Sequence, residues 1–297
     1  AATVVAAVTA ATDRLASSRR SPRAARSRIS SAVMIDRVLV HVDAHVAHVR
    51  LNRPEKRNGL DLPMFEALAA AGDRLRTEHG VRAVVLSGEG RAFCAGLDWA
   101  AFMTMADVAI PTLLDRPDGA LANLAQKVSV VWAELPMPVL AAVHGVAFGG
   151  GLQIALGADL RYVHPQAQLS VMEVRYGLVP DMGLSVLLRG VVRADVVREL
   201  AFTGAVVDGE EALRLGLATR VCDDPLADAL STARSIATRP PRAVRAIKRL
   251  LRESPGLDTA ASLRLESELQ RTLLGTPEQM EAVQAAFEKR DPRFDDP

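Results

Sequence analysis

Residues Val143–Asp159 read VHGVAFGGGLQIALGAD. The apolar run Val139–Val143 predicts a buried strand that leads into this stretch, and the apolar residues from about Gly150 onward predict a helix. The glycines Gly149–Gly151 therefore lie where the strand turns into the helix. Because glycine has no side chain, a ligand can approach the main chain there, and the first N–H groups of a helix have no partner within it. The stretch predicts backbone amides that stabilise negative charge on a ligand oxygen.

A second glycine-containing turn follows another predicted strand. The apolar run Val81–Ser87 ends at the turn Gly88–Gly90, and the stretch RAFCAGLD, Arg91–Asp98, comes next. Two separate loops can therefore each offer a backbone amide to one ligand oxygen. Cys94 lies in the second loop, but it has no basic partner nearby in the sequence, so we do not expect it to act as a nucleophile.

Strands alternate with helices over most of the chain. The stretch RVLVHVDAHVAHVRL, Arg37–Leu51, alternates like two strands of a hairpin, and Asp61 with Pro63 is typical of the start of a helix. This alternation predicts an α/β domain with right-handed crossovers. After about residue 195 the pattern predicts successive helices, at Gly209–Leu215, from Pro225, and at Arg242–Glu253, Leu263–Leu274 and Pro277–Lys289. We therefore predict an α/β core over 34–195 and a helical region over 196–297.

One of these helices has a strongly basic face. In Arg242–Glu253 the apolar residues form one stripe, and Arg242, Arg245, Lys248, Arg249 and Arg252 occupy the other side. Such a pattern is typical of a helix that packs through its apolar stripe and exposes its charges to solvent. Contact between the basic face and a phosphorylated ligand is the alternative.

Composition and charge narrow the class of protein. The 297 residues are 49% hydrophobic and 24% charged, which is typical of a globular chain. Residues 1–33 carry six of the 36 basic residues and one of the 35 acidic residues, so the chain from Met34 onward has a net charge of −4. We expect 1–33 to be a disordered or mis-assigned extension. A mildly acidic body does not suit nucleic acid or an anionic membrane as the main partner.

Several common site motifs are missing from the sequence. The turn at Gly88–Gly90 lacks the third glycine of a dinucleotide-binding fingerprint, and no phosphate-binding loop with its lysine occurs. No set of Cys and His residues has zinc spacing, so we expect no metal site. The two cysteines, Cys94 and Cys222, cannot form a disulfide framework, which favours a reducing, cytoplasmic location.

Four motifs in order resemble those of the enoyl-CoA hydratase/isomerase family, also called the crotonase family. They are NRPEKRNGLD at Asn52–Asp61, GRAFCAGLD at Gly90–Asp98, HGVAFGGGLQIALGADLRY at His144–Tyr162 and MEVRYGLVPDMG at Met172–Gly183. The resemblance covers essentially Val38–Phe294. It implies a crotonase-like core of ββα turns wound into a spiral, a C-terminal helical region used in trimerisation, and acyl-CoA thioester substrates.

The resemblance also implies roles for individual residues. The two amides of the family's oxyanion hole correspond to Leu97 and Gly150. Hydratases of the family carry two glutamates, and the corresponding positions here hold Gln153 and Glu173. Asp181 follows Glu173 by eight residues, as an aspartate does in the family's dienoyl-CoA isomerases, although those enzymes also carry an acid at the position of Gln153. Turn chemistry at Pro-Asp is an alternative role for Asp181.

Replacing one carboxylate by an amide removes a group that hydration needs for proton transfer. We therefore expect the chain to shift a double bond of an enoyl- or dienoyl-CoA, with Glu173 as the base, Asp181 as a second acid/base and Gln153 as a positioning group. A hydratase with one substituted acid and a non-catalytic acyl-CoA-binding relative are the alternatives. We expect no cofactor, since coenzyme A enters as part of the substrate, and a homotrimer or hexamer. Trp99, Phe102 and Met103 are expected in an acyl pocket or the core.

Overall fold

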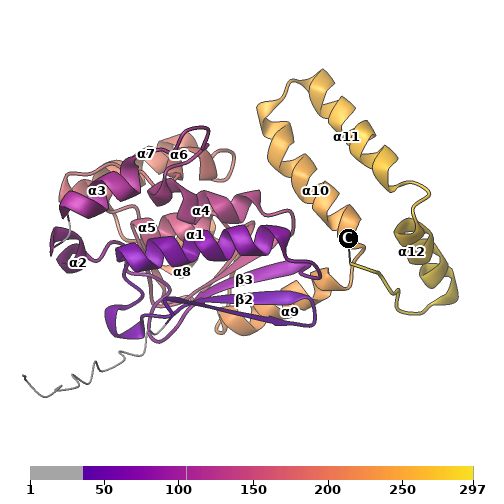
Figure 1. Ribbon diagram of the computed structural model, residues 1–297, viewed down its shortest axis with the longest axis horizontal. Coiled ribbons are helices and arrows are strands. Elements are labelled where there is room, and N and C mark those ends of the chain that lie inside the picture. The colour runs from indigo at the N-terminus through magenta and orange to yellow at the C-terminus, as the bar shows by residue number, and fades with distance from the viewer. Residues whose placement is uncertain (1–35, 105, 297) are drawn as a thin grey trace, which may run out of the picture. The chain divides into compact units, whose positions relative to one another are not determined.

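The computed structural model describes residues 36–104 and 106–296, so the prediction for residues 1–33 lies outside the described part of the chain. One sheet organises the described residues (Figure 1). Its strands run in the order β1-β2-β3-β4-β6-β8, and all neighbours are parallel except the hairpin β1-β2. The six strands are β1 Val38–Asp43, β2 Val46–Leu51, β3 Ala83–Gly88, β4 Val139–Val143, β6 Leu160–Val163 and β8 Arg220–Val221. The prediction of an α/β domain is confirmed.

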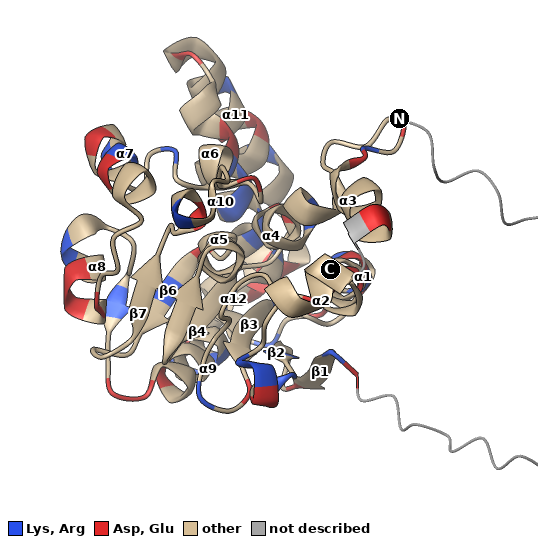
Figure 2. Ribbon diagram, turned by 90° about the vertical axis from the view of Figure 1, so that its left-hand side faces the viewer, with Lys and Arg blue, Asp and Glu red and all other residues tan. Residues whose placement is uncertain are grey.

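The two faces of the central strands are both buried, as continuous apolar runs require. Val84 and Leu86 of β3 belong to one apolar core, whereas Ala83 and Val85 belong to another on the opposite face. Among the helices that contribute to the first core, three supply many of its residues: α1 Leu62–Thr77, α4 Leu124–Glu134 and α5 Gly150–Leu156. The second core is closed by α9 Pro225–Ala237, which lies across the sheet from the other three (Figure 2).

Local sequence signals mark the start of helix α1. The side chain of Asp61 accepts a hydrogen bond from the Met64 N–H at 3.0 Å, and Pro63 occupies the first turn. Both features stabilise a helix start. Gly72 allows α1 to pack closely on α4, because a Cβ atom there would lie 2.4 Å from a methyl group of Val131. Gly72 therefore sets how closely α1 packs on α4.

Helices dominate the chain after residue 195, but they do not form a separate unit. The remaining helices there are α7 Ala194–Thr203, α8 Gly209–Leu215, α10 Pro241–Glu253, α11 Thr259–Leu273 and α12 Pro277–Glu288. Strand β8 and helix α9 also follow residue 195, yet β8 pairs with β6 and α9 closes the second core. The α/β core therefore continues past the boundary predicted at residue 195, because the two-residue β8 is too short to give a strand pattern.

Helix α10 does not expose its basic face as the sequence predicts. Lys248 is buried, and its Nζ lies 2.9 Å from the Met137 carbonyl oxygen, 3.3 Å from that of Trp132 and 2.8 Å from an Asp159 carboxylate oxygen. Ile247 and Leu251, from the apolar stripe, are instead 55% and 67% exposed. Three oxygen partners offset the cost of burying the ammonium group. The prediction of a fully solvated basic face is therefore wrong at Lys248.

A buried ion network joins the start of α1 to the loop that contains Leu97. Arg53 lies 2.7 Å from an Asp98 carboxylate oxygen and 3.4 Å from one of Asp61, and it donates to the Gly59 carbonyl at 2.9 Å. Arg37 contacts Asp61 from the other side at 2.7 Å. Asp98 in turn accepts a hydrogen bond from the Ala101 N–H, at the start of helix α2 Trp99–Thr104. The network therefore fixes the start of α1 to the loop that contains Leu97 and to the start of α2.

No helix in the described residues is both long enough and apolar enough to cross a membrane.

Replacing Arg53 by methionine should lower the free energy of unfolding by about 3 kcal/mol, because the partly buried Asp98 loses its arginine partner and the buried Asp61 loses one of its two. Urea denaturation followed by circular dichroism measures the change. The matched control is Arg74→Met, which breaks the exposed Arg74–Glu78 pair and should cost less than about 1 kcal/mol. Equal costs for the two variants would contradict a structural role for the Arg53 network.

Candidate active site

Two loops from separate strands lie against each other through main-chain hydrogen bonds. The Cys94 N–H donates to the Val146 carbonyl at 3.0 Å, and the Phe148 N–H donates to the Cys94 carbonyl at 3.1 Å. Val146 and Phe148 belong to strand β5 Val146–Phe148, which pairs with β7 Gln168–Ser170 in a second, two-stranded sheet. Gly151 permits this approach, because a Cβ atom there would lie 2.3 Å from the Cys94 carbonyl oxygen. Only glycine fits at this contact.

The Leu97 N–H is left free by its neighbours. The Leu60 N–H donates to the Gly96 carbonyl at 2.8 Å, and the Asp98 N–H donates to the Leu60 carbonyl at 3.0 Å. In such a bridge the residue between the two bonded positions directs its own N–H to the other side. Within residues 36–104 and 106–296, the Leu97 N–H has no hydrogen-bond acceptor.

Gly150 provides the second free N–H as the first residue of α5. The preceding Gly149 has φ 50° and ψ −117°, a conformation that only glycine adopts readily. A Cβ atom on Gly150 would lie 2.5 Å from the Met182 sulfur. In the described part of the chain the Gly150 N–H has no acceptor. Leu97 and Gly150, the two residues with free main-chain donors, line the same cavity.

Glu173 begins the short 3-10 helix η2 Glu173–Tyr176, which follows β7. Its Oε1 accepts a hydrogen bond from Gln153 Nε2 at 2.7 Å, whereas its buried Oε2 has no partner among the described residues. Burial raises the pKa of the Glu173 carboxyl; the hydrogen bond from Gln153 opposes this rise, and the charge of Asp181 adds to it. One carboxylate oxygen is therefore held by a hydrogen bond, and the other has no partner in the described chain.

Gln153 is fixed as a hydrogen-bond donor to Glu173. The side chain is buried, and its Oε1 accepts from the Met182 N–H at 2.9 Å and from the Leu184 N–H at 3.2 Å. These two donors require the carbonyl end of the amide to face them, so the NH2 end must face Glu173. Turning the amide over would place its NH2 group against the N–H donors of Met182 and Leu184. It therefore orients the carboxylate and favours its charged form.

Asp181 is near Glu173 but makes no hydrogen bond with it. Its side chain lies more exposed than that of Glu173, and partial burial raises the pKa of the Asp181 carboxyl. Asp181 follows Pro180, but neither residue lies in a turn or a helix, so the turn role considered for Asp181 is not seen, whereas the residue does line the cavity. Two carboxylates with raised pKa values at one cavity are suited to moving protons.

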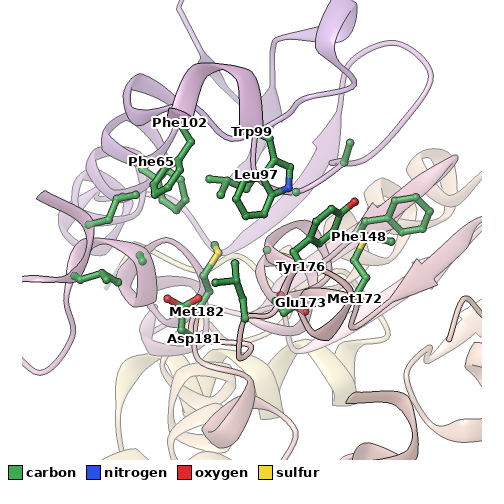
Figure 3. A pocket seen from close by; sticks show the side chains of 18 of the residues that line it. Phe65, Leu97, Trp99, Phe102, Phe148, Met172, Glu173, Tyr176, Asp181 and Met182 are labelled. Carbon is green, nitrogen blue, oxygen red and sulfur yellow. The ribbon is translucent and has the colours of Figure 1, made fainter. Parts of the chain in front are cut away.

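A cavity of about 340 Å³ joins these groups. Leu97, Gly150, Glu173 and Asp181 all line it, whereas Gln153 supports it from behind. Apolar side chains form most of the wall, and Figure 3 shows the rings of Phe65 and Phe102 at the opposite side from the two carboxylates. The predicted site residues are therefore brought together. Trp99 and Phe102 also line the cavity as expected.

Two predictions for residues near the site have clear outcomes. Met103 is 68% exposed and is not part of the cavity wall, so its expected place in the pocket or the core is wrong. Cys94 is buried and donates to the Asn58 carbonyl, and burial raises the pKa of its thiol to about 12. A neutral thiol at ordinary pH is a poor nucleophile.

Several residues of the cavity could not be identified from the sequence. Phe65 projects from α1, Phe148 ends β5, and Tyr176 follows Glu173 by one helical turn. The spacing between Glu173 and Tyr176 is the only signal that could have placed Tyr176 near the base. The backbone donors of Met182 and Leu184, which fix Gln153, carry no sequence signal.

No group of three or more His, Cys, Asp or Glu side chains in the described residues is placed to hold a metal ion.

The chain is similar in sequence to known enzymes of one family. The family model for enoyl-CoA hydratase/isomerase matches residues 41–297. The rat mitochondrial Delta(3,5)-Delta(2,4)-dienoyl-CoA isomerase is 34% identical over 261 residues, covering 83% of this chain and 78% of that protein. The 1,2-epoxyphenylacetyl-CoA isomerase of Escherichia coli is 34% identical over 275 residues, covering 88% of this chain and 99% of that protein.

Solved structures show the same fold. The crystal structure of enoyl-CoA hydratase from Bacillus anthracis superposes with a TM-score of 0.80 at 28% sequence identity, covering 87% of this chain and 99% of that chain. The predicted crotonase fold is thereby confirmed. The family match extends over most of the chain, and the relatives named above are covered over more than three quarters of their length. The chain therefore belongs to the enoyl-CoA hydratase/isomerase family of enzymes.

Proposed function

We propose that this enzyme shifts a double bond in an enoyl- or dienoyl-CoA through an enolate bound by the N–H groups of Leu97 and Gly150. One observation carries the proposal: Leu97 and Gly150, each with a free main-chain N–H, and Glu173, whose carboxylate has one oxygen without a partner among the described residues, line the same cavity. Donors placed where charge develops stabilise an enolate more than the neutral thioester. Stabilising the enolate makes the protons on the adjacent carbon more acidic.

The proton balance of this reaction requires no outside donor. The Glu173 carboxylate removes a proton from one carbon of the acyl chain, and the electron pair moves onto the thioester oxygen. A proton then returns at another carbon of the conjugated system, from Glu173 or from Asp181. Substrate and product have the same composition: when Glu173 returns the proton its carboxylate is regenerated directly, and when Asp181, initially protonated, supplies the proton, a proton must pass from Glu173 to Asp181 to complete the cycle.

The fixed orientation of Gln153 favours isomerisation over hydration. Adding water requires a group that deprotonates the water and a group that protonates carbon. Gln153 presents amide N–H bonds to Glu173 and has no proton of suitable acidity to give. Glu173 would have to perform both transfers alone in a hydratase.

The remaining features of the proposal follow from the family. Coenzyme A enters as part of the substrate, no further cofactor takes part, and the metabolism of fatty acids or related acyl groups is the expected setting. A homotrimer or hexamer is supported by large apolar side chains that α10, α11 and α12 expose in the single chain, such as Leu251, Leu263 and Phe287. A cytoplasmic location is supported by the two free cysteines.

A panel of three thioesters tests the reaction class. Purified protein is incubated with 2-trans-enoyl-CoA, 3-enoyl-CoA and 3,5-dienoyl-CoA while ultraviolet absorbance and product mass are recorded. We expect the absorbance of the 3-enoyl or the 3,5-dienoyl substrate to change without a change in mass. A product heavier by one water would instead establish a hydratase, and binding without turnover of any thioester would establish a non-catalytic relative.

Replacing Glu173 by glutamine should lower kcat by about 10²- to 10⁴-fold, because the amide cannot accept the substrate proton. The unfolding temperature should not fall, since the variant removes a buried charge with one unpartnered oxygen. The matched control is Glu199→Gln, an exposed site, which should keep full activity. An active Glu173→Gln enzyme would exclude Glu173 as the base.

The pH dependence of kcat/KM should identify the role of Gln153. Activity needs ionised Glu173, so kcat/KM should fall as the pH drops through the raised pKa of this carboxyl. In Gln153→Leu the hydrogen bond that lowers this pKa is lost, so the acidic limb should move to higher pH. Exposed Gln166→Leu serves as control. An unshifted limb in an otherwise folded Gln153→Leu enzyme would show that Gln153 does not tune the base.

A further inference from the structure

Aromatic residues are much more frequent in the cavity wall than in the sequence as a whole. The sequence holds seven Phe, two Trp and two Tyr residues, which is 4% of its length. Five of these eleven line the one cavity: Phe65, Trp99, Phe102, Phe148 and Tyr176. Aliphatic residues and alanine fill most of the core elsewhere in the described chain. The wall of the cavity is therefore built differently from the rest of the interior.

Three of these rings are in contact with one another. The ring centroids of Trp99 and Tyr176 lie 5.1 Å apart with a tilt of 37° between the rings. The centroids of Trp99 and Phe102 lie 6.2 Å apart with the rings nearly perpendicular, at 83°. Both separations are within the range of attractive ring–ring contact. The contacts link α2, which follows the Leu97 amide, to η2, which carries Glu173 (Figure 3).

Tyr176 is not placed there to fill the core. Its side chain is 54% exposed, and a ring this exposed gains little from burial in the free enzyme. The Trp99 contact holds the ring at the cavity wall, one helical turn from the base. An exposed ring held beside a cavity gains apolar contact only when a ligand covers it.

We propose that the cavity selects a planar, π-rich acyl group, an aryl ring or a conjugated chain, over a saturated group of the same carbon number. Trp99 and Tyr176 determine this preference. The inference rests on the proposed function, since it assumes an acyl thioester whose carbonyl lies at Leu97 and Gly150. A planar group can lie against the tilted Trp99–Tyr176 pair and meet Phe102 or Phe65 edge-on, whereas a puckered ring or a kinked chain cannot stack.

Matched thioesters that cannot isomerise give a direct test. We compare 3-phenylpropanoyl-CoA with 3-cyclohexylpropanoyl-CoA, which share carbon number and connectivity and differ in ring planarity. Neither has a double bond to shift, so isothermal titration calorimetry reports binding alone. We expect the phenyl thioester to bind the wild-type enzyme about 3- to 10-fold more tightly, the range expected for a ring–ring contact beyond area burial.

Variants assign the preference to the two residues. Trp99→Leu and Tyr176→Leu should each reduce the phenyl-to-cyclohexyl ratio towards one, whereas Tyr176→Phe, which keeps the ring, should retain it. Phe202→Leu is the matched control, because Phe202 is 74% exposed and lies outside the cavity wall. Thermal unfolding of each variant shows that the fold is intact.

The outcomes separate this inference from the proposed function. Equal or weaker binding of the phenyl thioester by the wild type would overturn the selectivity and leave the acyl-CoA function standing. An unchanged ratio in both leucine variants would overturn the assignment to Trp99 and Tyr176. Failure of both thioesters to bind would overturn the selectivity together with the proposed function.

Discussion

The contact between Gly151 and the Cys94 carbonyl is the constraint on which the site depends. Leu97 and Gly150 belong to loops about fifty residues apart in the sequence, and only this close approach allows their N–H groups to border one cavity. The main-chain bonds between Cys94 and β5 fix the separation of the loops without using the N–H of Leu97 or of Gly150. Any side chain at position 151 would force the loops apart. The hole is therefore a consequence of backbone packing, and its donors are in place before a ligand arrives.

The surroundings of Glu173 cost folding free energy, whereas satisfied main-chain hydrogen bonds hold the two loops. Glu173 has one buried carboxylate oxygen without a partner, and burial raises the pKa of the group. Both features cost folding free energy, because a buried charge is normally satisfied on all sides. Gln153 recovers part of this cost with a single hydrogen bond and leaves the other oxygen reactive. Full satisfaction of the carboxylate would stabilise the chain and remove its basicity.

Sequence patterns located the main chain of the site better than its side-chain surroundings. The glycine triplet, the strand before it and the helix after it have local signals, so the start of α5 and the N–H of Gly150 could be predicted. Lys248 could not, because its burial depends on three oxygens that only the folded chain brings together. The same holds for Phe65 and Tyr176. Each lies in an element whose own pattern is ordinary, and tertiary packing alone brings them to one wall.

A single turn of α5 fixes the base relative to the hole. Gly150 and Gln153 are three residues apart in that helix, so they are separated by about 4.5 Å along its axis and lie on nearly the same face. Gln153 holds Glu173 through its NH2 group and the Met182 N–H through its carbonyl, while the Met182 sulfur lies where a Cβ atom of Gly150 would be. Helix α5 therefore positions the Gly150 N–H, Glu173 and the segment that carries Asp181. A displacement of α5 would move all of them together, whereas a change at Gln153 would disturb Glu173 and the Met182–Leu184 segment without changing the main chain of Gly150. The free N–H groups of Leu97 and Gly150 therefore do not depend on whether position 153 carries an amide or a carboxyl group.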